Sequence, residues 1–134
     1  MPVLLSEQRH IQTAEDVVAV RQAVRQRAIE LGFNLVDQTK IVTAASELAR
    51  NTLQYAGGGT LTLEGVDEAG RRGLRLIFED HGPGIADIQL AMKDGYSSGG
   101  GLGLGLGGAR RLASEFHIHS KVGEGTRVTI VRWR

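Results

Sequence analysis

The feature that most constrains this chain is a run of glycines broken by leucines, GGGLGLGLGG at residues 99–108. The run holds seven of the 19 glycines among 134 residues, and three more stand together at 57–59. A flexible linker would be rich in serine and would lack regularly spaced apolar residues. This run carries Leu102, Leu104 and Leu106 and leads into a helical pattern. Because glycine lets a backbone approach a ligand closely, we expect the run to border a binding site.

Composition narrows the classes of function. The chain has 16 Lys and Arg against 15 Asp and Glu, so a net charge of +1 gives no strong attraction to nucleic acid or an anionic membrane. The absence of cysteine excludes disulfides, thiolate metal sites and cysteine nucleophiles. The sequence has neither a membrane-spanning apolar run nor a signal-peptide pattern. We therefore expect a single cytoplasmic domain over residues 1–134, with no nucleic-acid or membrane partner.

Apolar residues recurring at three- and four-residue steps predict two helices, at residues 15–31 and 36–56. Thr13 with Asp16 resembles a capping box for the first helix, and Asp37 is a plausible cap for the second. The glycines at 57–59 end the second helix.

The rest of the chain predicts strands and shorter helices, and residues 1–12 are either an N-terminal extension or an edge strand. The predicted elements are strands at 60–64 and 74–79 joined by a polar loop at 67–73, a short helix at 86–92, a third helix from Gly107 or Gly108 through Phe116, and strands at 117–121 and 126–132. Residues 93–100 are expected to be mobile. This order predicts an α+β two-layer sandwich, with helices on one face of a mostly antiparallel sheet.

Glu47 and Asn51 stand four residues apart on the second predicted helix, so their side chains share one face. A carboxylate beside an amide oxygen suits a hard cation such as Mg²⁺, and the carboxylate could orient a hydroxyl for attack. Taken alone, the pair is explained more simply by a solvated helix face.

The segment from Asp80 to Gly84, DHGPG, follows an apolar strand. Aspartate, glycine and proline are common in turns, so a plain turn is one interpretation. The other places Asp80 at the strand end as an acceptor for an exocyclic amine, with Gly82 and Gly84 leaving room for a flat base.

The glycine run matches the pattern G-x-G-x-x-G, but no strand precedes it as a dinucleotide-binding fold requires, and a Walker A lysine is absent. A third interpretation is a lid that ends at a helix N-terminus, where free amides and the helix dipole favour phosphates. In that case the leucines anchor the lid while its backbone faces the phosphates.

Taken together, helix E-x-x-x-N, strand-D-x-G-x-G, a glycine-rich lid and G-x-G-T resemble the Bergerat ATP-binding fold of gyrase, the ninety-kilodalton chaperone, histidine kinases and mismatch-repair ATPases. The segments at 46–51, 79–85, 94–97 and 131–133 resemble the stressosome switch serine/threonine kinase, within the anti-sigma-factor kinase branch. That branch typically has histidine four residues after the asparagine, where this chain has Tyr55, which disfavours sigma-factor sequestration.

The resemblance implies a role for each matching residue. Asn51 would coordinate Mg²⁺, and Glu47 would be the general base. Asp80 would bind the adenine amino group, with Thr126 contributing through water. The remaining implied ATP contacts are Gly82 and Gly84 at the adenine pocket, Gly101, Leu102, Gly103, Leu104 and Gly105 around the phosphates, and Arg110, a basic residue that no motif fixes, near the terminal phosphate.

The implied function is an ATP- and Mg²⁺-dependent protein serine/threonine kinase. Its substrate would be a STAS-domain antagonist or stressosome scaffold protein, and partner switching would let it activate a serine phosphatase. The alternatives are a non-catalytic ATP-gated adaptor and an anti-sigma factor that acts by sequestration.

Overall fold

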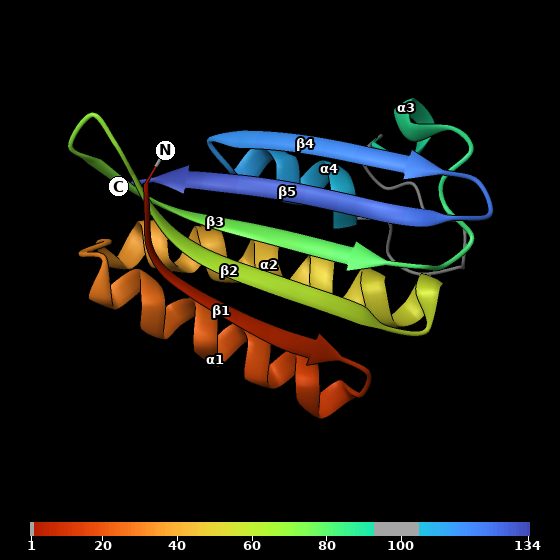
Figure 1. Cartoon of the computed structure of the whole chain (residues 1–134), viewed down its shortest axis with the longest axis horizontal. Helices are drawn as coiled ribbons and strands as arrows, with labels where there is room; N and C mark the ends of the chain where they lie inside the picture. The colour runs from red at the N-terminus through yellow and green to blue at the C-terminus, as the bar shows by residue number, and fades with distance from the viewer. Residues whose placement is uncertain (1, 93–104) are drawn as a thin grey trace.

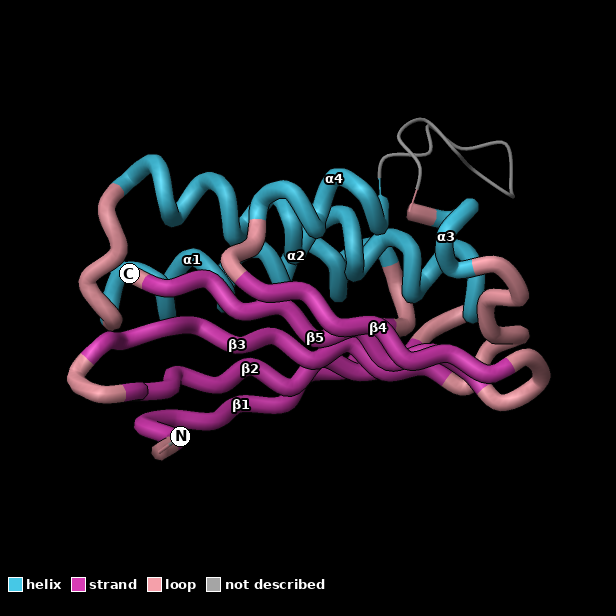
Figure 2. Tube along the Cα trace, turned by 90° about the horizontal axis from the view of Figure 1, so that it is seen from above, coloured by secondary structure: helices cyan, strands magenta, loops and turns pink. Residues whose placement is uncertain are grey.

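The computed structural model describes residues 2–92 and 105–134, and it places the helices on one face of a sheet (Figure 1, Figure 2). The strands lie in the order β1-β2-β3-β5-β4, and each neighbouring pair is antiparallel. The predicted α+β two-layer sandwich is confirmed. The elements are β1 (Val3–Ile11), α1 (Ala14–Glu30), α2 (Leu35–Ala56), β2 (Gly59–Glu68), β3 (Arg71–Asp80), α3 (Ile88–Ala91), α4 (Gly105–Leu112), β4 (Glu115–Lys121) and β5 (Gly125–Trp133).

Both long helices begin at a capping side chain. The Thr13 hydroxyl accepts from the Asp16 backbone N–H, and the Asp16 carboxylate accepts from the Thr13 N–H, so the predicted capping box is confirmed. The prediction of Asp37 as the cap of α2 was wrong. Asn34 is the cap, and its side chain accepts from the Asp37 N–H at 2.8 Å. The Asp37 carboxylate instead pairs with Arg132 of β5 at 2.6 Å.

The hairpin of β2 and β3 is longer than predicted, because the polar residues assigned to a loop at 67–73 mostly continue the two strands. The turn itself is Ala69 and Gly70, with φ of 54° and 82°. Positive φ at both central residues is the backbone of a type I′ turn, whose twist matches that of the strands. The alternation of apolar residues thus located the strands but not their exposed ends.

The structure decides between the two alternatives for the N-terminal segment, and two further boundaries differ from prediction. Residues 3–11 form β1, so the N-terminal segment contains an edge strand. The short helix covers Ile88–Ala91 rather than 86–92. The third helix ends at Leu112, and Phe116 lies in β4, where backbone pairing sets it opposite Ile130. The segment 93–100, predicted to be mobile, lies outside the described residues.

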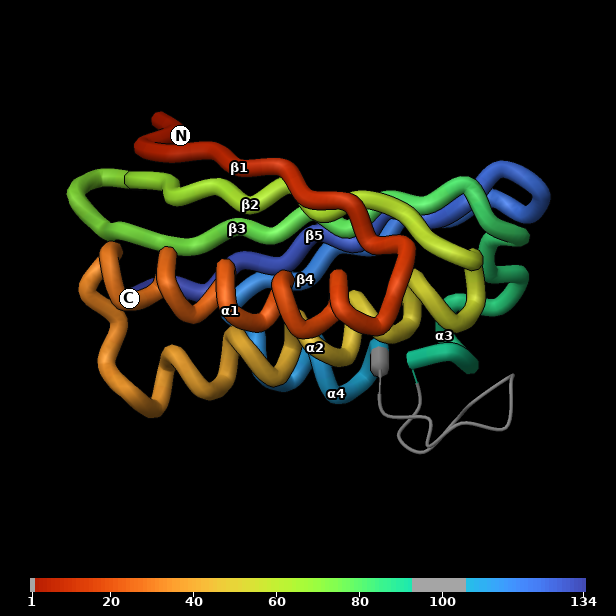
Figure 3. Tube along the Cα trace, turned by 90° about the horizontal axis from the view of Figure 1, so that it is seen from below, coloured from red at the N-terminus to blue at the C-terminus, as the bar shows by residue number. Residues whose placement is uncertain are grey.

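The core lies between the sheet and helices α1, α2 and α4, which lie side by side over it (Figure 3). Its largest fully buried side chains come from both layers: Ile11, Val20, Val24, Ile41, Leu48, Leu61, Leu63, Leu74, Leu76 and Ile130. A second, smaller cluster of Val66, Val131 and Trp133 completes the described apolar packing. Among the described residues, no helix is both long and apolar enough to cross a membrane.

Candidate functional site

The C-terminal half of α2 carries Glu47 and Asn51. Because α2 is continuous from Leu35 to Ala56, the two side chains lie about one turn apart on one face, as their spacing predicted. The Glu47 side chain is 24% exposed, and its Oε1 accepts a hydrogen bond from Arg50 Nη1 at 3.2 Å. Asn51 is half-buried. This face therefore presents an amide oxygen and a carboxylate. Oxygen atoms of both kinds are ligands that suit Mg²⁺, and the carboxylate can also accept a hydrogen bond from a hydroxyl.

Asp80 is the last residue of β3 and belongs to a row of polar residues across the sheet. Backbone pairing places it opposite Thr126 of β5, which lies opposite Ser120 of β4. Phe78 and Val128, two residues further in, are paired in the same way and buried in the core. Since side chains two residues apart share a face, the polar row lies on the side of the sheet that the helices cover.

Glycines allow close packing around Asp80. A Cβ on Gly125 would lie 2.1 Å from the Asp80 carbonyl oxygen. A Cβ on Gly59 would lie 3.2 Å from Asp80 Cβ and 2.7 Å from the Thr52 methyl group. Thr52 directly follows Asn51 on α2, so this turn of α2 adjoins the strand end that carries Asp80.

The loop after β3 is held against the rest of the protein at both of its predicted glycines. The Gly82 N–H donates to Asp80 Oδ1 at 2.9 Å, and a Cβ on Gly82 would lie 2.6 Å from Ala56 Cβ at the end of α2. Gly84 has φ of 76°, and a Cβ there would lie 2.3 Å from the Lys121 carbonyl oxygen. Both positions thus require glycine for contacts within the protein, and their role in an adenine pocket stays a prediction.

The glycine run leads into α4, which begins two residues before the earliest predicted start. Gly105 is the first residue of α4. The other predicted phosphate contacts, Gly101, Leu102, Gly103 and Leu104, lie outside the described residues.

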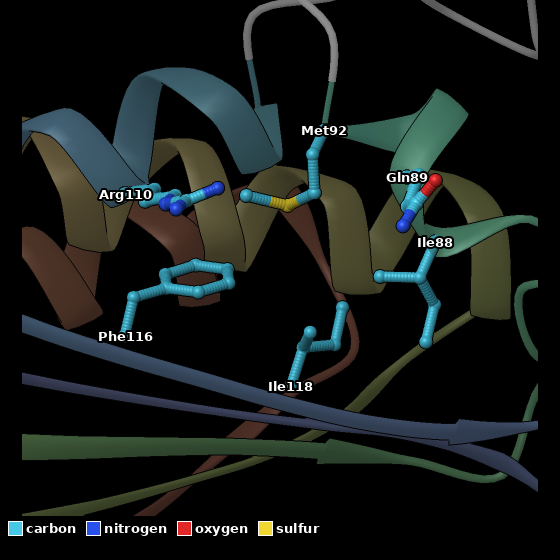
Figure 4. Close-up of a pocket in the computed structure, with 6 residues that line it drawn as sticks. All are labelled: Ile88, Gln89, Met92, Arg110, Phe116 and Ile118. Carbon is cyan, nitrogen blue, oxygen red and sulfur yellow. The ribbon is translucent and has the colours of Figure 1, made fainter.

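Arg110 of α4 lines an open pocket of about 510 Å³ (Figure 4). Met92 extends toward Arg110, and Phe116 and Ile118 rise from β4 (Figure 4). The remaining lining residues are Ile88 and Gln89. Of the predicted site residues in the described part of the chain, only Arg110 lines this pocket, and its lining residue Ile118 stands two residues before Ser120 on the same face of β4.

Sequence reasoning missed Ser120 and Gly59. The signal for Ser120 was the register of the last hairpin, because a turn at 122–125 sets Ser120 opposite Thr126. Gly59 was grouped with the glycines that end α2, although it pairs within the sheet beside Asp80.

Comparison with known proteins gives this arrangement a family. Residues 36–134 match the family of histidine kinase-, DNA gyrase B-, and HSP90-like ATPases. The chain is 52% identical over 123 residues to the serine/threonine-protein kinase RsbT of Bacillus subtilis. The aligned residues cover 92% of each of the two chains.

Two solved structures share the fold. The RsbU and RsbW domains of Rv1364c from Mycobacterium tuberculosis align with a TM-score of 0.60 at 23% identity, over 96% of this chain and 33% of that one. The mycobacterial sensor histidine kinase MprB aligns with a TM-score of 0.58 at 19% identity, over 96% of this chain and 97% of that one. The chain therefore belongs to the histidine kinase-, DNA gyrase B- and HSP90-like ATPase family, within its serine/threonine-protein kinase branch.

Proposed function

We propose that this kinase uses Mg·ATP to phosphorylate a serine or threonine of a STAS-domain antagonist or stressosome scaffold protein. By exchanging partners it then binds and activates a serine phosphatase in stress or sigma-factor regulation. The observation that carries the proposal is the 52% identity to a serine/threonine-protein kinase over 92% of the chain. The position of Asn51 and Thr52 beside the strand end of Asp80 supports one shared nucleotide site.

In this site Asp80 binds the adenine amino group. Its Oδ1 already accepts the Gly82 N–H, which leaves Oδ2 for the ligand. Thr126, opposite Asp80 in the sheet, contributes through water. The segment 101–105 and the N-terminus of α4 hold the phosphates, because free amides and the helix dipole favour negative charge there.

Asn51 holds Mg²⁺ through its amide oxygen, which fits the preference of this ion for oxygen ligands shared with phosphate and water. When bound, Mg²⁺ neutralises charge on the phosphates. Arg110 supplies a cation for the terminal phosphate from the second turn of α4.

Glu47 takes the proton of the acceptor hydroxyl as the hydroxyl oxygen bonds to the γ-phosphorus. ADP leaves with the electrons of the broken P–O bond, and the proton remains on the Glu47 carboxylate. The Arg50 guanidinium, bound to Oε1, keeps one oxygen engaged and leaves Oε2 for the acceptor hydroxyl.

The test is transfer of label from γ-labelled ATP, with and without Mg²⁺, to a purified STAS-domain protein from the same organism. Glu47→Gln should abolish transfer and leave the dissociation constant of ATP within a few-fold. Glu68→Gln, at the exposed far end of β2, is the matched control and should transfer normally. Loss of ATP affinity in Glu47→Gln would make Glu47 a binding residue instead of the base.

Asp80→Asn tests the adenine contact and should weaken ATP binding sharply. Asp67→Asn is its control, since Asp67 Oδ1 also accepts a glycine N–H, that of Gly70, at the other end of the same hairpin. An unchanged dissociation constant of ATP in Asp80→Asn would contradict the assignment of Asp80 to adenine. ATP binding without any transfer would favour an ATP-gated adaptor, and tight binding of a sigma factor would favour sequestration.

A further inference from the structure

Ser120 joins three segments at the polar end of the sheet. Its hydroxyl accepts the Ile85 backbone N–H at 2.8 Å, which ties the loop after β3 to the edge strand β4. The same oxygen lies 3.1 Å from the Gly125 carbonyl oxygen and 2.8 Å from Thr126 Oγ1 at the start of β5. No motif in the sequence marks this serine.

Only one assignment of the hydroxyl protons satisfies all three contacts at once. A serine hydroxyl has one proton to donate and two lone pairs that accept. The Ile85 N–H can only donate, so it takes one lone pair, and the Gly125 carbonyl can only accept, so it takes the proton. The contact with Thr126 is then satisfied only if the Thr126 hydroxyl donates to the second lone pair of Ser120.

This assignment leaves Thr126 Oγ1 with no proton for a ligand. The atom can therefore only accept, and the water through which Thr126 contributes must donate one of its protons to it. Asp80, its neighbour across the sheet, is a carboxylate and also only accepts. A water that donates one proton to Thr126 and the other to the Asp80 carboxylate has only lone pairs left, so it accepts from a ligand N–H and cannot donate to a carbonyl oxygen.

We propose that Ser120 is a positioning residue for base selection. By accepting the Thr126 proton it makes that hydroxyl an acceptor, and so strengthens the preference of the site for a 6-amino purine over a 6-oxo purine. The inference rests on the proposed binding of adenine at Asp80 and Thr126. Asp80 discriminates directly, and Ser120 adds to the discrimination through Thr126.

The test compares the dissociation constants of ATP and inosine triphosphate, which carries an oxygen in place of the 6-amino group. Ser120→Ala frees the Thr126 hydroxyl to rotate and donate, so the ratio of the inosine to the adenine constant should fall about three- to tenfold, the range for one hydrogen bond. Ser120→Thr keeps a hydroxyl and should restore the ratio. Thr126→Val should lower the ratio, and adding Ser120→Ala to it should change the ratio no further.

The outcomes separate this inference from the assignment on which it depends. Equal weakening of both nucleotides in Ser120→Ala, or an unchanged ratio, would mean that Ser120 only supports the loop and would overturn the inference. If Ser120→Ala does not fold, an unchanged ratio in Thr126→Val overturns it as well. Equal binding of both nucleotides by the wild-type protein would instead overturn the adenine assignment at Asp80, and the role of Ser120 with it.

Discussion

The ion pair of Arg132 and Asp37 predicts a large loss of stability from one substitution on the last strand. Arg132 Nη2 donates to Asp37 Oδ1 at 2.6 Å, and Nη1 donates to the Leu112 carbonyl oxygen at 2.8 Å. One guanidinium therefore links the first turn of α2 to the last residue of α4. The two side chains are only 17% and 21% exposed, so solvent screens the pair much less than a surface pair.

The magnitude follows from these contacts. Hydrogen bonds to charged groups contribute roughly 1.5–3 kcal/mol, and breaking a fully buried pair costs about 3–5 kcal/mol. Because a fifth of each side chain still meets water, we expect Arg132→Gln to lower the free energy of unfolding by about 2–3 kcal/mol. For a chain of this size the melting temperature should fall by about 10 °C.

Urea denaturation of the single variants Arg132→Gln and Asp37→Asn, and of the double variant, measures the pair directly. The coupling energy between the two should be about 1–2 kcal/mol. Arg127→Gln, on the exposed face of the same strand, is the control and should change stability by less than about 0.5 kcal/mol. Additive losses in the double variant, or a loss in Arg132→Gln no larger than in the control, would refute the reasoning.

Three further predictions concern single positions. Gly84→Ala should lose about 1–3 kcal/mol of stability, because alanine strains at φ of 76° and its Cβ would lie 2.3 Å from a carbonyl oxygen; an unchanged urea midpoint would contradict this. The Asp16 carboxylate accepts a hydrogen bond from the Gln12 backbone N–H, which holds the pKa of Asp16 below its ordinary value of 3.8. The stabilisation by ionised Asp16 is therefore present above that value and lost as pH falls through the lower folded pKa, so the stability advantage of the wild type over Asp16→Ala in urea titrations should disappear in strong acid. Gly73→Ala should displace the single tryptophan, because the added Cβ would lie 2.6 Å from Trp133 Cε3, and fluorescence emission that stayed unshifted would count against that packing.

The sequence predicted those parts of the fold that rest on local periodicity. The apolar stripes of α1 and α2 and the alternation in β3 and β5 repeat at the spacing of their own element, so they were visible without the rest of the chain. The strand β1 was predicted only as one of two alternatives, because its alternation is weak: the charged residues Glu7 and Arg9 occupy positions that face the helices. Glu7 pairs with Arg27 of α1 at 3.0 Å, a contact that makes a charged residue compatible with that side of the sheet.

Helix boundaries show a similar limit. Asn34 and Asp37 are both residue types that cap helices, and local sequence does not choose between them. The choice follows from Arg132, which lies 95 residues along the chain and takes the Asp37 carboxylate. A contact between the first turn of one helix and the last strand is outside the range of any local pattern.

The residues of the candidate site show the same difference between local patterns and long-range contacts. Glu47, Asn51, Asp80 and Thr126 belong to short motifs with fixed spacing, so the sequence singled them out as candidates. Ser120 belongs to no motif. Its proposed role depends on the hydrogen bond from the Ile85 N–H, which lies 35 residues away in sequence and so leaves no local pattern. Hydrogen bonds that decide which hydroxyl donates depend on three strand ends meeting, which only the folded chain specifies.

The floor of the candidate site follows from side-chain size along the sheet. Two rows of in-register residues on the helix-covered face are bulky and apolar: Leu63, Leu76, Ile130 and Phe116, then Leu61, Phe78, Val128 and Ile118. The next row is Gly59, Asp80, Thr126 and Ser120, in which the side chains are small and, apart from the glycine, polar. Bulky apolar rows of this kind pack against the helices. A row of small polar side chains leaves space above the sheet and offers groups that form hydrogen bonds. The same alternation that builds the core therefore ends in a surface suited to a flat, hydrogen-bonding ligand, because only the residue types in the last row change.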